Sequence, residues 1–270
     1  MIIDIHPHVI SRDESRYPRA PLGGKQSDWS RERPVSAGEM LQAMDEAGIE
    51  RSILVQASTC YGHDNSYLAD AVAAHPQRFG GVFSVDVLAA DAPEKIRHWK
   101  AHGLIGLRVF VAGHTTAQAV RLDDPRSFPA WDCAVAQGLP ICIQLRAPGL
   151  PQLEAMLDRF PRARVILDHL ARPETDDGPP YRKAAGLVAL ARYENLFRKL
   201  TTHNVHDAPA EFLVRAVKRF GAERVAWGSN YPAAKGRLAE LLAQGREVLA
   251  KLSEAEREWI FSRTARSLYG

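Results

Sequence analysis

Two histidines close to the start of the chain have the spacing of a pair of ligands. His6 and His8 follow the apolar run Met1–Ile5 and are separated by one residue. Because alternate side chains of an extended chain point to the same side, both imidazoles are expected to face one interior. Neutral imidazoles at this spacing can bind a divalent metal, which polarises a carbonyl group or lowers the pKa of bound water to about 7. An isolated His-X-His is more often an incidental surface pair, but the apolar run before this one favours a site.

His169 is a third candidate of the same kind. It follows the apolar run Val165–Leu167 and the carboxylate of Asp168, which either orients the imidazole or pairs with a helix. The alternative for His169 is a core histidine bonded to a backbone carbonyl. We place His169 with the first two histidines among the candidates for catalysis.

Two cations lie inside apolar runs. Arg108 and Lys199 occupy positions where a buried charge needs an anionic partner. That partner is either a substrate carboxylate or an internal one, such as Asp4 or Asp86. Further polar residues near the ends of apolar runs are Gln144, Arg146, His203 and Asn230.

The pattern of the whole chain predicts the element order that would bring these residues together. Short β-branched runs alternate with amphipathic segments, as expected for parallel strands joined by crossover helices. Ser36 and Glu39 predict a capping box at the start of one helix, and Gly48 predicts its end. The predicted strands are Ile2–His6, Arg51–Gln56, Gly80–Asp86, Leu104–Val111, Pro140–Leu145, Arg164–His169, Asn195–Leu200 and Arg224–Trp227.

Eight such strands predict an α/β protein built as a single-domain (β/α)8 TIM barrel over residues 1–270. In this fold the active site lies at the C-terminal ends of the strands, where the candidate residues fall. An open doubly wound sheet is the alternative, but the sequence has no GxGxxG after any strand.

The longest stretch without a predicted element is residues 9–35, which we interpret as a lid loop over the site. Its arginines either line the entrance for an anionic substrate or belong to a solvated loop. They are Arg12, Arg16, Arg19, Arg31 and Arg33.

Composition excludes several classes of protein. The 35 basic and 32 acidic side chains leave a net charge of +3, which is too small for a nucleic-acid partner. The three cysteines have no CxxC spacing, so we expect neither a disulfide framework nor a thiolate zinc site. No signal peptide and no membrane-spanning run is recognisable. We expect a cytoplasmic protein, monomer or homodimer, with a small anionic molecule as its substrate and no membrane partner.

The candidate residues, taken in order, resemble the amidohydrolase superfamily. The resemblance is to amidohydrolase-related family 2, in the branch that contains 2-pyrone-4,6-dicarboxylate lactonase and sugar-acid lactonases, and it spans the chain. Its motifs are DIHPH at 4–8, GLRVF at 106–110, VILDHLARP at 165–173, RKLTTHN at 198–204, WGSNYP at 227–232 and the closing TARSLYG.

The resemblance implies a metal-independent or weakly metal-dependent hydrolase in which water attacks the carbonyl of a carboxylated lactone. His6, His8 and His169, with or without a divalent metal such as zinc, would stabilise the oxyanion. It also implies a set of side chains that bind the substrate and its carboxylates: Arg108, Gln144, Arg146, Arg172, Lys199 and His203.

Two departures from the family pattern bear on the mechanism. Metal-dependent relatives place a histidine where this chain has Gln144, which argues against a tightly held metal. Asn230 stands where the lactonases have the aspartate that acts as general base, and an amide cannot accept that proton.

Three explanations for Asn230 remain open. It is an inactivating substitution that traps substrate, or it marks a natural branch in which His169, His8 or His203 takes the proton. In the third, the chain is a catalytically silent binding protein. Among enzymes, the alternative is a zinc-dependent decarboxylase of an aromatic or unsaturated acid in the same superfamily.

Overall fold

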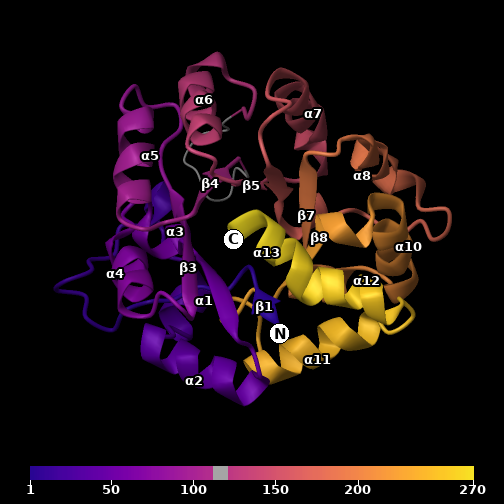
Figure 1. Cartoon of the computed structure of the whole chain (residues 1–270), viewed down its shortest axis with the longest axis horizontal. Helices are drawn as coiled ribbons and strands as arrows, with labels where there is room; N and C mark the ends of the chain where they lie inside the picture. Colours follow the sequence, from indigo (N-terminus) through magenta and orange to yellow (C-terminus); the bar gives the residue numbers. More distant parts are fainter. Residues whose placement is uncertain (112–120) are drawn as a thin grey trace.

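Eight parallel strands follow one another around a barrel in chain order (Figure 1). A computed structural model describes residues 1–111 and 121–270. Every neighbouring pair from the first to the eighth strand is parallel, which confirms the predicted barrel. The strands are β1 (Ile3–Asp4), β2 (Arg51–Val55), β3 (Phe79–Ser84), β4 (Gly106–Phe110), β5 (Ile141–Gln144), β6 (Val165–Leu167), β7 (Leu196–Thr201) and β8 (Val225–Gly228).

Helices surround the barrel on its outside (Figure 1). The predicted capping box of Ser36 and Glu39 is present, and Gly48 ends that helix in the left-handed conformation. The α-helices are α1 (Asp28–Glu32), α2 (Ala37–Ala47), α3 (Ser58–Tyr61), α4 (Ser66–Ala74), α5 (Ala92–Ala101), α6 (Phe128–Ala136), α7 (Leu150–Arg159), α8 (Ala185–Ala189), α9 (Thr202–Asp207), α10 (Ala210–Phe220), α11 (Leu238–Val248), α12 (Glu254–Glu258) and α13 (Thr264–Tyr269).

Short helical turns complete the chain. Among the described residues, no helix is both long enough and apolar enough to cross a membrane. The 3-10 turns are η1 (Leu22–Gly24), η2 (Pro125–Ser127), η3 (Ala147–Gly149), η4 (Asp168–Ala171), η5 (Arg182–Ala184), η6 (Leu190–Arg192) and η7 (Ala222–Arg224), and the π-helical turn η8 (Trp259–Arg263) joins α12 to α13.

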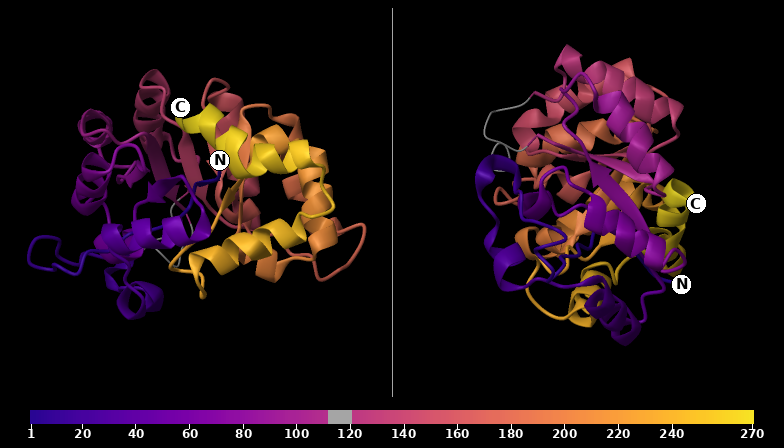
Figure 2. Two further views of the ribbon diagram at one scale, coloured as in Figure 1. Left: turned by 60° about the horizontal axis from the view of Figure 1, so that its bottom comes forward. Right: turned by 90° about the vertical axis from the view of Figure 1, so that its left-hand side faces the viewer.

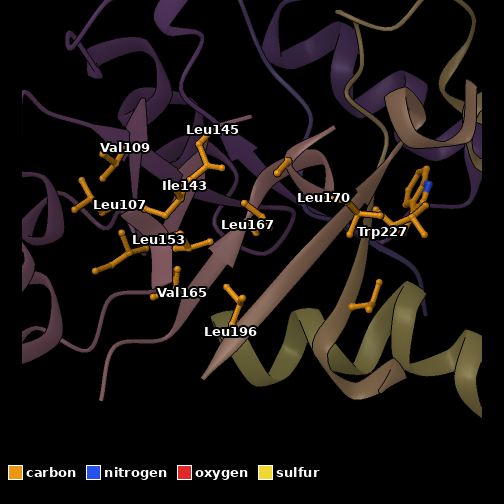
Figure 3. Close-up of a cluster of buried hydrophobic side chains, with 14 of the residues drawn as sticks. Leu107, Val109, Ile143, Leu145, Leu153, Val165, Leu167, Leu170, Leu196 and Trp227 are labelled. Carbon is orange, nitrogen blue, oxygen red and sulfur yellow. The ribbon is translucent and has the colours of Figure 1, made fainter. Parts of the chain in front are cut away.

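Two of the three apolar clusters among the described residues form the core of the barrel. The larger core lies between strands and helices, and Figure 3 shows part of it, with Leu107, Ile143 and Leu167 on successive strands. The smaller core fills the N-terminal end of the barrel, where Leu268 and Tyr269 of α13 pack against residues of the strands. α13 covers this end of the barrel, and the candidate residues lie at the opposite end, after the C-terminal ends of the strands.

The first and last strands approach each other closely. The N–H of Ile5 donates to the carbonyl of Trp227 at 3.3 Å. A Cβ atom at Gly228 would lie 2.6 Å from the Cβ of His6, so only glycine permits this approach. Because Gly228 has no side chain, β8 can lie directly against the segment that carries His6.

Six of the predicted strands, β1 to β6, end one or two residues before the apolar pattern indicates, and the early ends of β1 and β6 bear on the site. β1 stops at Asp4 because the N–H of His6 bonds to the carboxylate of Asp4 at 3.0 Å instead of to a neighbouring strand. β6 stops at Leu167 because the chain turns into η4 immediately after it. Each of these two strands therefore ends shortly before a candidate histidine, His6 or His169.

The predicted lid loop at 9–35 carries η1 and α1, so it is not structureless. Its indigo ribbon extends beyond the body of the barrel (Figure 2). The arginines of this loop contact other residues of the protein, mostly surface carboxylates, as expected of a solvated loop. Their contacts are Arg12 with Glu39, Arg16 with Asp70, Arg19 with Glu14, Arg31 with Asp28, and Arg33 with the carbonyls of Pro232 and Ala233.

Candidate active site

A buried cluster of cations around one carboxylate lies at the C-terminal ends of the strands. Nε of Arg108, from β4, donates to Oδ2 of Asp168 at 3.1 Å. Nζ of Lys199, from β7, lies 3.1 Å from Oδ1 of the same carboxylate. Both cations therefore have an internal partner, and it is Asp168, not Asp4 or Asp86. Pairing is required here because an unpaired charge is costly to bury.

His6 lies between the two cations. Its Nδ1 is 3.2 Å from Nζ of Lys199, and its Nε2 is 3.5 Å from Nη2 of Arg108. Burial, reinforced by the charge of Lys199, holds the pKa of His6 well below its usual value. His6 is therefore a neutral imidazole with a single lone pair, and the shorter contact assigns that lone pair to Nδ1.

Asp4 fixes the segment that carries His6. Its Oδ1 accepts hydrogen bonds from the backbone N–H groups of His6 at 3.0 Å and Ser229 at 2.9 Å. Burial raises the pKa of Asp4 to about 6. The carboxylate thus joins the residues after β1 to those after β8, and it acts on the site through the backbone.

His169 reaches the cluster through an unusual turn. Four consecutive residues, from His169 to Arg172, have φ between 51° and 56°. The left-handed conformation costs about 1–2 kcal/mol for each residue that is not glycine. Side chains of the next strand and helix hold the turn: Thr201 Oγ1 lies 2.7 Å from Nδ1 of His169, and Asn204 Nδ2 donates to the carbonyl of His169 at 2.7 Å. Strain retained in this way is typical of functional sites.

The turn sets both the position and the tautomer of His169. Its ring centroid lies 4.7 Å from that of His6 and 5.2 Å from that of His203. The hydroxyl of Thr201 donates to Asn204 at 3.4 Å, so it accepts the hydrogen of His169 Nδ1. The lone pair of His169 is therefore on Nε2, and burial keeps the pKa of this imidazole well below its usual value.

His8 and Asn230 form a second pair beside the cluster. Nδ1 of His8 donates to the carbonyl of Val55 at 2.8 Å, which leaves the lone pair on Nε2. Burial, with the charge of Arg108, lowers the pKa of His8 to about 3. The Asn230 side chain is within hydrogen-bonding reach of His8, and among the described residues its buried Nδ2 has no partner. The amide nitrogen carries two N–H donors, so Asn230 can donate to a ligand in the cavity.

A cavity of about 270 Å³ opens above the cluster. Two residues of the predicted lid loop, Ser27 and Trp29, border it, and the Trp29 ring lies 5.2 Å from that of His8. Much of the exposed lining surface is apolar, and hydroxyl and amide groups make up most of its polar side chains. Arg108 is the one cation in the lining, and no carboxylate contributes, as far as the described residues go. The lining residues are His8, Ser27, Trp29, Gln56, Ala57, Ser58, Thr59, Arg108, Phe110, Gln144, His203, Asn230 and Ala233.

The structure brings together eight of the sequence candidates. Five line the cavity: His8, Arg108, Gln144, His203 and Asn230. Three lie in the buried cluster next to it: His6, His169 and Lys199.

Two candidate arginines lie elsewhere. Arg172 pairs with Asp207 at 2.9 Å near the surface, and Arg146 is exposed, so neither lines the cavity. Conversely, sequence reasoning gave no role to Trp29, Phe110 or Gln56. Trp29 is one of two aromatic residues in the long loop, with Tyr17, and a large aromatic side chain in a loop is the signal that could have suggested it.

Three side chains have the donor atoms of a metal site. His6, Asp168 and His169 each bring one nitrogen or oxygen within 4.8 Å of the others. The sequence predicted His6, His8 and His169 as the ligands, whereas the structure groups His6 and His169 with Asp168. The ammonium of Lys199 lies next to two of the three, at 3.2 Å from His6 and 3.1 Å from Asp168. With that ammonium in place, the residues do not fit a divalent cation.

The barrel carries a cavity at the C-terminal ends of its strands, which is where enzymes of this fold have their active site. The chain belongs to the amidohydrolase family, whose sequence model matches residues 3–270. It is therefore a hydrolase of the amidohydrolase superfamily. Its relatives include the L-fucono-1,5-lactonase of Burkholderia ambifaria, 28% identical over 247 residues, which are 86% of this chain and 81% of the relative.

Solved structures share the fold at lower identity. A protein from Pseudomonas putida assigned as a 2-pyrone-4,6-dicarboxylic acid hydrolase has a TM-score of 0.82 and 22% identity, covering 100% of this chain and 97% of that one. An amidohydrolase from Burkholderia multivorans with bound zinc has a TM-score of 0.80 and 21% identity, covering 100% and 99%. A 2,6-dihydroxybenzoate decarboxylase from Rhizobium has a TM-score of 0.73 and 18% identity, covering 99% and 98%.

Proposed function

We propose that this protein hydrolyses a lactone, with His203 as the general base and Asn230 and Arg108 as the groups that bind the developing oxyanion. The observation that carries the proposal is the cavity itself, which places a half-buried imidazole, an amide with an unpartnered N–H group and one guanidinium around the same space. Water attack on an ester carbonyl needs a base for the water and donors for the oxygen that becomes negative. The lactonase relative in Burkholderia ambifaria supports the same reaction.

His203 is the best base among the imidazoles that line the cavity. Burial, followed by the charge of Arg172, lowers the pKa of His203 below its usual value, so the ring is neutral at pH 7 and can accept a proton. His8, the other imidazole of the lining, has a pKa of about 3 and is too weak a base near neutral pH. His203 therefore acts as the general base. Asn230 cannot fill this role because its amide has no lone pair of sufficient basicity.

Asn230 and Arg108 are suited to the carbonyl oxygen of the substrate. The free N–H of the amide can donate to the oxyanion without losing another partner. The guanidinium of Arg108 adds a charge-assisted donor, and after ring opening it can bind the new carboxylate of the product. Donors arranged before the reaction stabilise the transition state at no further cost in reorganisation.

The hydroxyl and amide groups of the lining, with a single cation among them, favour a hydroxylated lactone of the sugar-acid kind with at most one carboxylate. Ser27, Ser58 and Thr59 offer hydroxyl groups, while a dicarboxylate would place two charges in a space where Arg108 is the one cation of the described lining. The rings of Trp29 and Phe110 can pack against the carbon faces of a sugar ring.

Acid release from a panel of lactones tests the proposal. The panel contains L-fucono-1,5-lactone, further sugar-acid lactones, a lactone of a monocarboxylic acid and 2-pyrone-4,6-dicarboxylate. We expect turnover of at least one hydroxylated lactone with kcat/KM at least tenfold above that of the dicarboxylate. If no lactone is opened and 2,6-dihydroxybenzoate releases carbon dioxide, the chain is a decarboxylase and the proposal is wrong.

Replacing Arg108 by Met should lower kcat/KM for the best lactone by about 10- to 100-fold, because a hydrogen bond to a charged group contributes about 1.5–3 kcal/mol. Asp168 keeps Lys199 as its partner, so the variant should still fold. Steady-state kinetics with circular dichroism measure both effects. Arg162→Met, which removes an exposed arginine outside the cavity, is the matched control. An equal loss in both variants would eliminate a specific role for Arg108.

A further inference from the structure

We propose that the ammonium of Lys199 is the resident cation of this site, occupying the position of a divalent metal, and that removing it turns the site into a metal site. The lysine is fully buried in β7 and does not line the cavity. Its Nζ lies where the lone pairs of two donor groups meet, 3.2 Å from Nδ1 of His6 and 3.1 Å from Oδ1 of Asp168.

The donor group around Lys199 has the composition of a metal site. One carboxylate and two neutral imidazoles, from Asp168, His6 and His169, offer ligand atoms within 4.8 Å of one another. Carboxylate oxygen and imidazole nitrogen are ordinary zinc ligands. Oδ1 of Asp168 forms no hydrogen bond among the described residues, so the ammonium beside it satisfies it by charge alone.

The ammonium and a divalent ion exclude each other. An ion bound by Asp168 and His6 would lie within contact of Nζ, and like charges repel strongly where water is excluded. Lys199 cannot withdraw to solvent because its side chain is completely buried. Arg108, 3.5 Å from the other ring nitrogen of His6, adds a second positive charge. Both nitrogens of His6 are thus next to cationic donors.

This arrangement gives Lys199 a positioning role. By donating to Nδ1 of His6, the ammonium places the ring hydrogen on Nε2, and it holds the Asp168 carboxylate that also binds Arg108. Lys199 thereby aligns the guanidinium that lines the cavity, and it does not itself bind a substrate carboxylate. The inference concerns the same site as the proposed lactonase reaction but rests on contacts beneath the cavity.

Metal binding by purified protein tests the inference apart from turnover. The native chain, Lys199→Met and the double variant Lys199→Met/His169→Ala are dialysed against zinc and then against buffer, and bound zinc is measured by atomic absorption. Cobalt titration followed by visible absorption reports ligand number. Circular dichroism establishes that each protein is folded, and Lys199→Gln replaces Lys199→Met if the latter does not fold.

We expect less than 0.1 zinc per native chain, about one per chain in Lys199→Met, and a loss of that zinc in the double variant, as orders of magnitude for one three-donor site. One zinc per native chain with lysine present would overturn the inference, and so would a folded Lys199→Met that binds none. Lactone turnover by the native, metal-free protein is a separate measurement, so the proposed function can fail while the inference holds, or the reverse.

Discussion

Replacing Asn230 by Asp should lower kcat for the best lactone by about 10²- to 10³-fold, the loss typical when one oxyanion donor is removed. A carboxylate has no N–H to donate, and it would bring a negative charge beside the oxygen that becomes negative. Steady-state kinetics on the native and variant chains measure the effect. The result is counterintuitive, because aspartate is the residue that the lactonase pattern expects at this position.

The backbone makes this substitution a clean test. Asn230 has φ of 57°, a conformation that Asn and Asp both tolerate better than other side chains. Asn230→Gly provides the comparison, since glycine also adopts this backbone conformation, removes the donor without adding a charge, and should lose activity to a similar extent. If Asn230→Asp instead gains activity, the aspartate is the native general base, and the asparagine of this chain is an inactivating change.

The barrel could be predicted because its signals are local. Strands buried on both faces give continuous apolar runs, and the capping box of Ser36 and Glu39 and the end of the helix at Gly48 each lie within a few residues. His6, His8 and His169 could likewise be proposed because each follows such a run. The ends of β1 and β6 could not, since they depend on a carboxylate of the same segment and on a left-handed turn that no composition rule signals.

The pairing of the buried charges was beyond sequence reasoning. Arg108 and Lys199 both meet Asp168, and this depends on the register of three strands that are distant in the sequence. The sequence posed the choice between substrate and internal partners correctly but offered Asp4 and Asp86 as examples. The lining contributed by Trp29 depends on how a long loop folds back, which periodicity does not describe.

Replacing His203 by Gln should lower kcat/KM by about 10²- to 10⁴-fold, the usual contribution of a positioned general base. Glutamine keeps the polarity and approximate size of the ring but cannot accept the proton. His206→Gln is the matched control, because this histidine lies three residues further along α9 and is exposed, with its Nε2 3.0 Å from Gln244. Comparable losses in both variants would point to damage to α9 and against a base at His203.

The pH profile identifies the base independently of the size of the loss. The neutral form of His203 is the active one, and burial with the charge of Arg172 lowers its pKa below 6.5. Activity of the native chain should therefore be level above pH 6.5 and fall tenfold per pH unit only below that lowered pKa. Arg172→Gln removes one cause of the shift, so the acid limb should move toward higher pH. A limb that stays in place in Arg172→Gln and persists in His203→Gln belongs to another group, and His203 is then not the base.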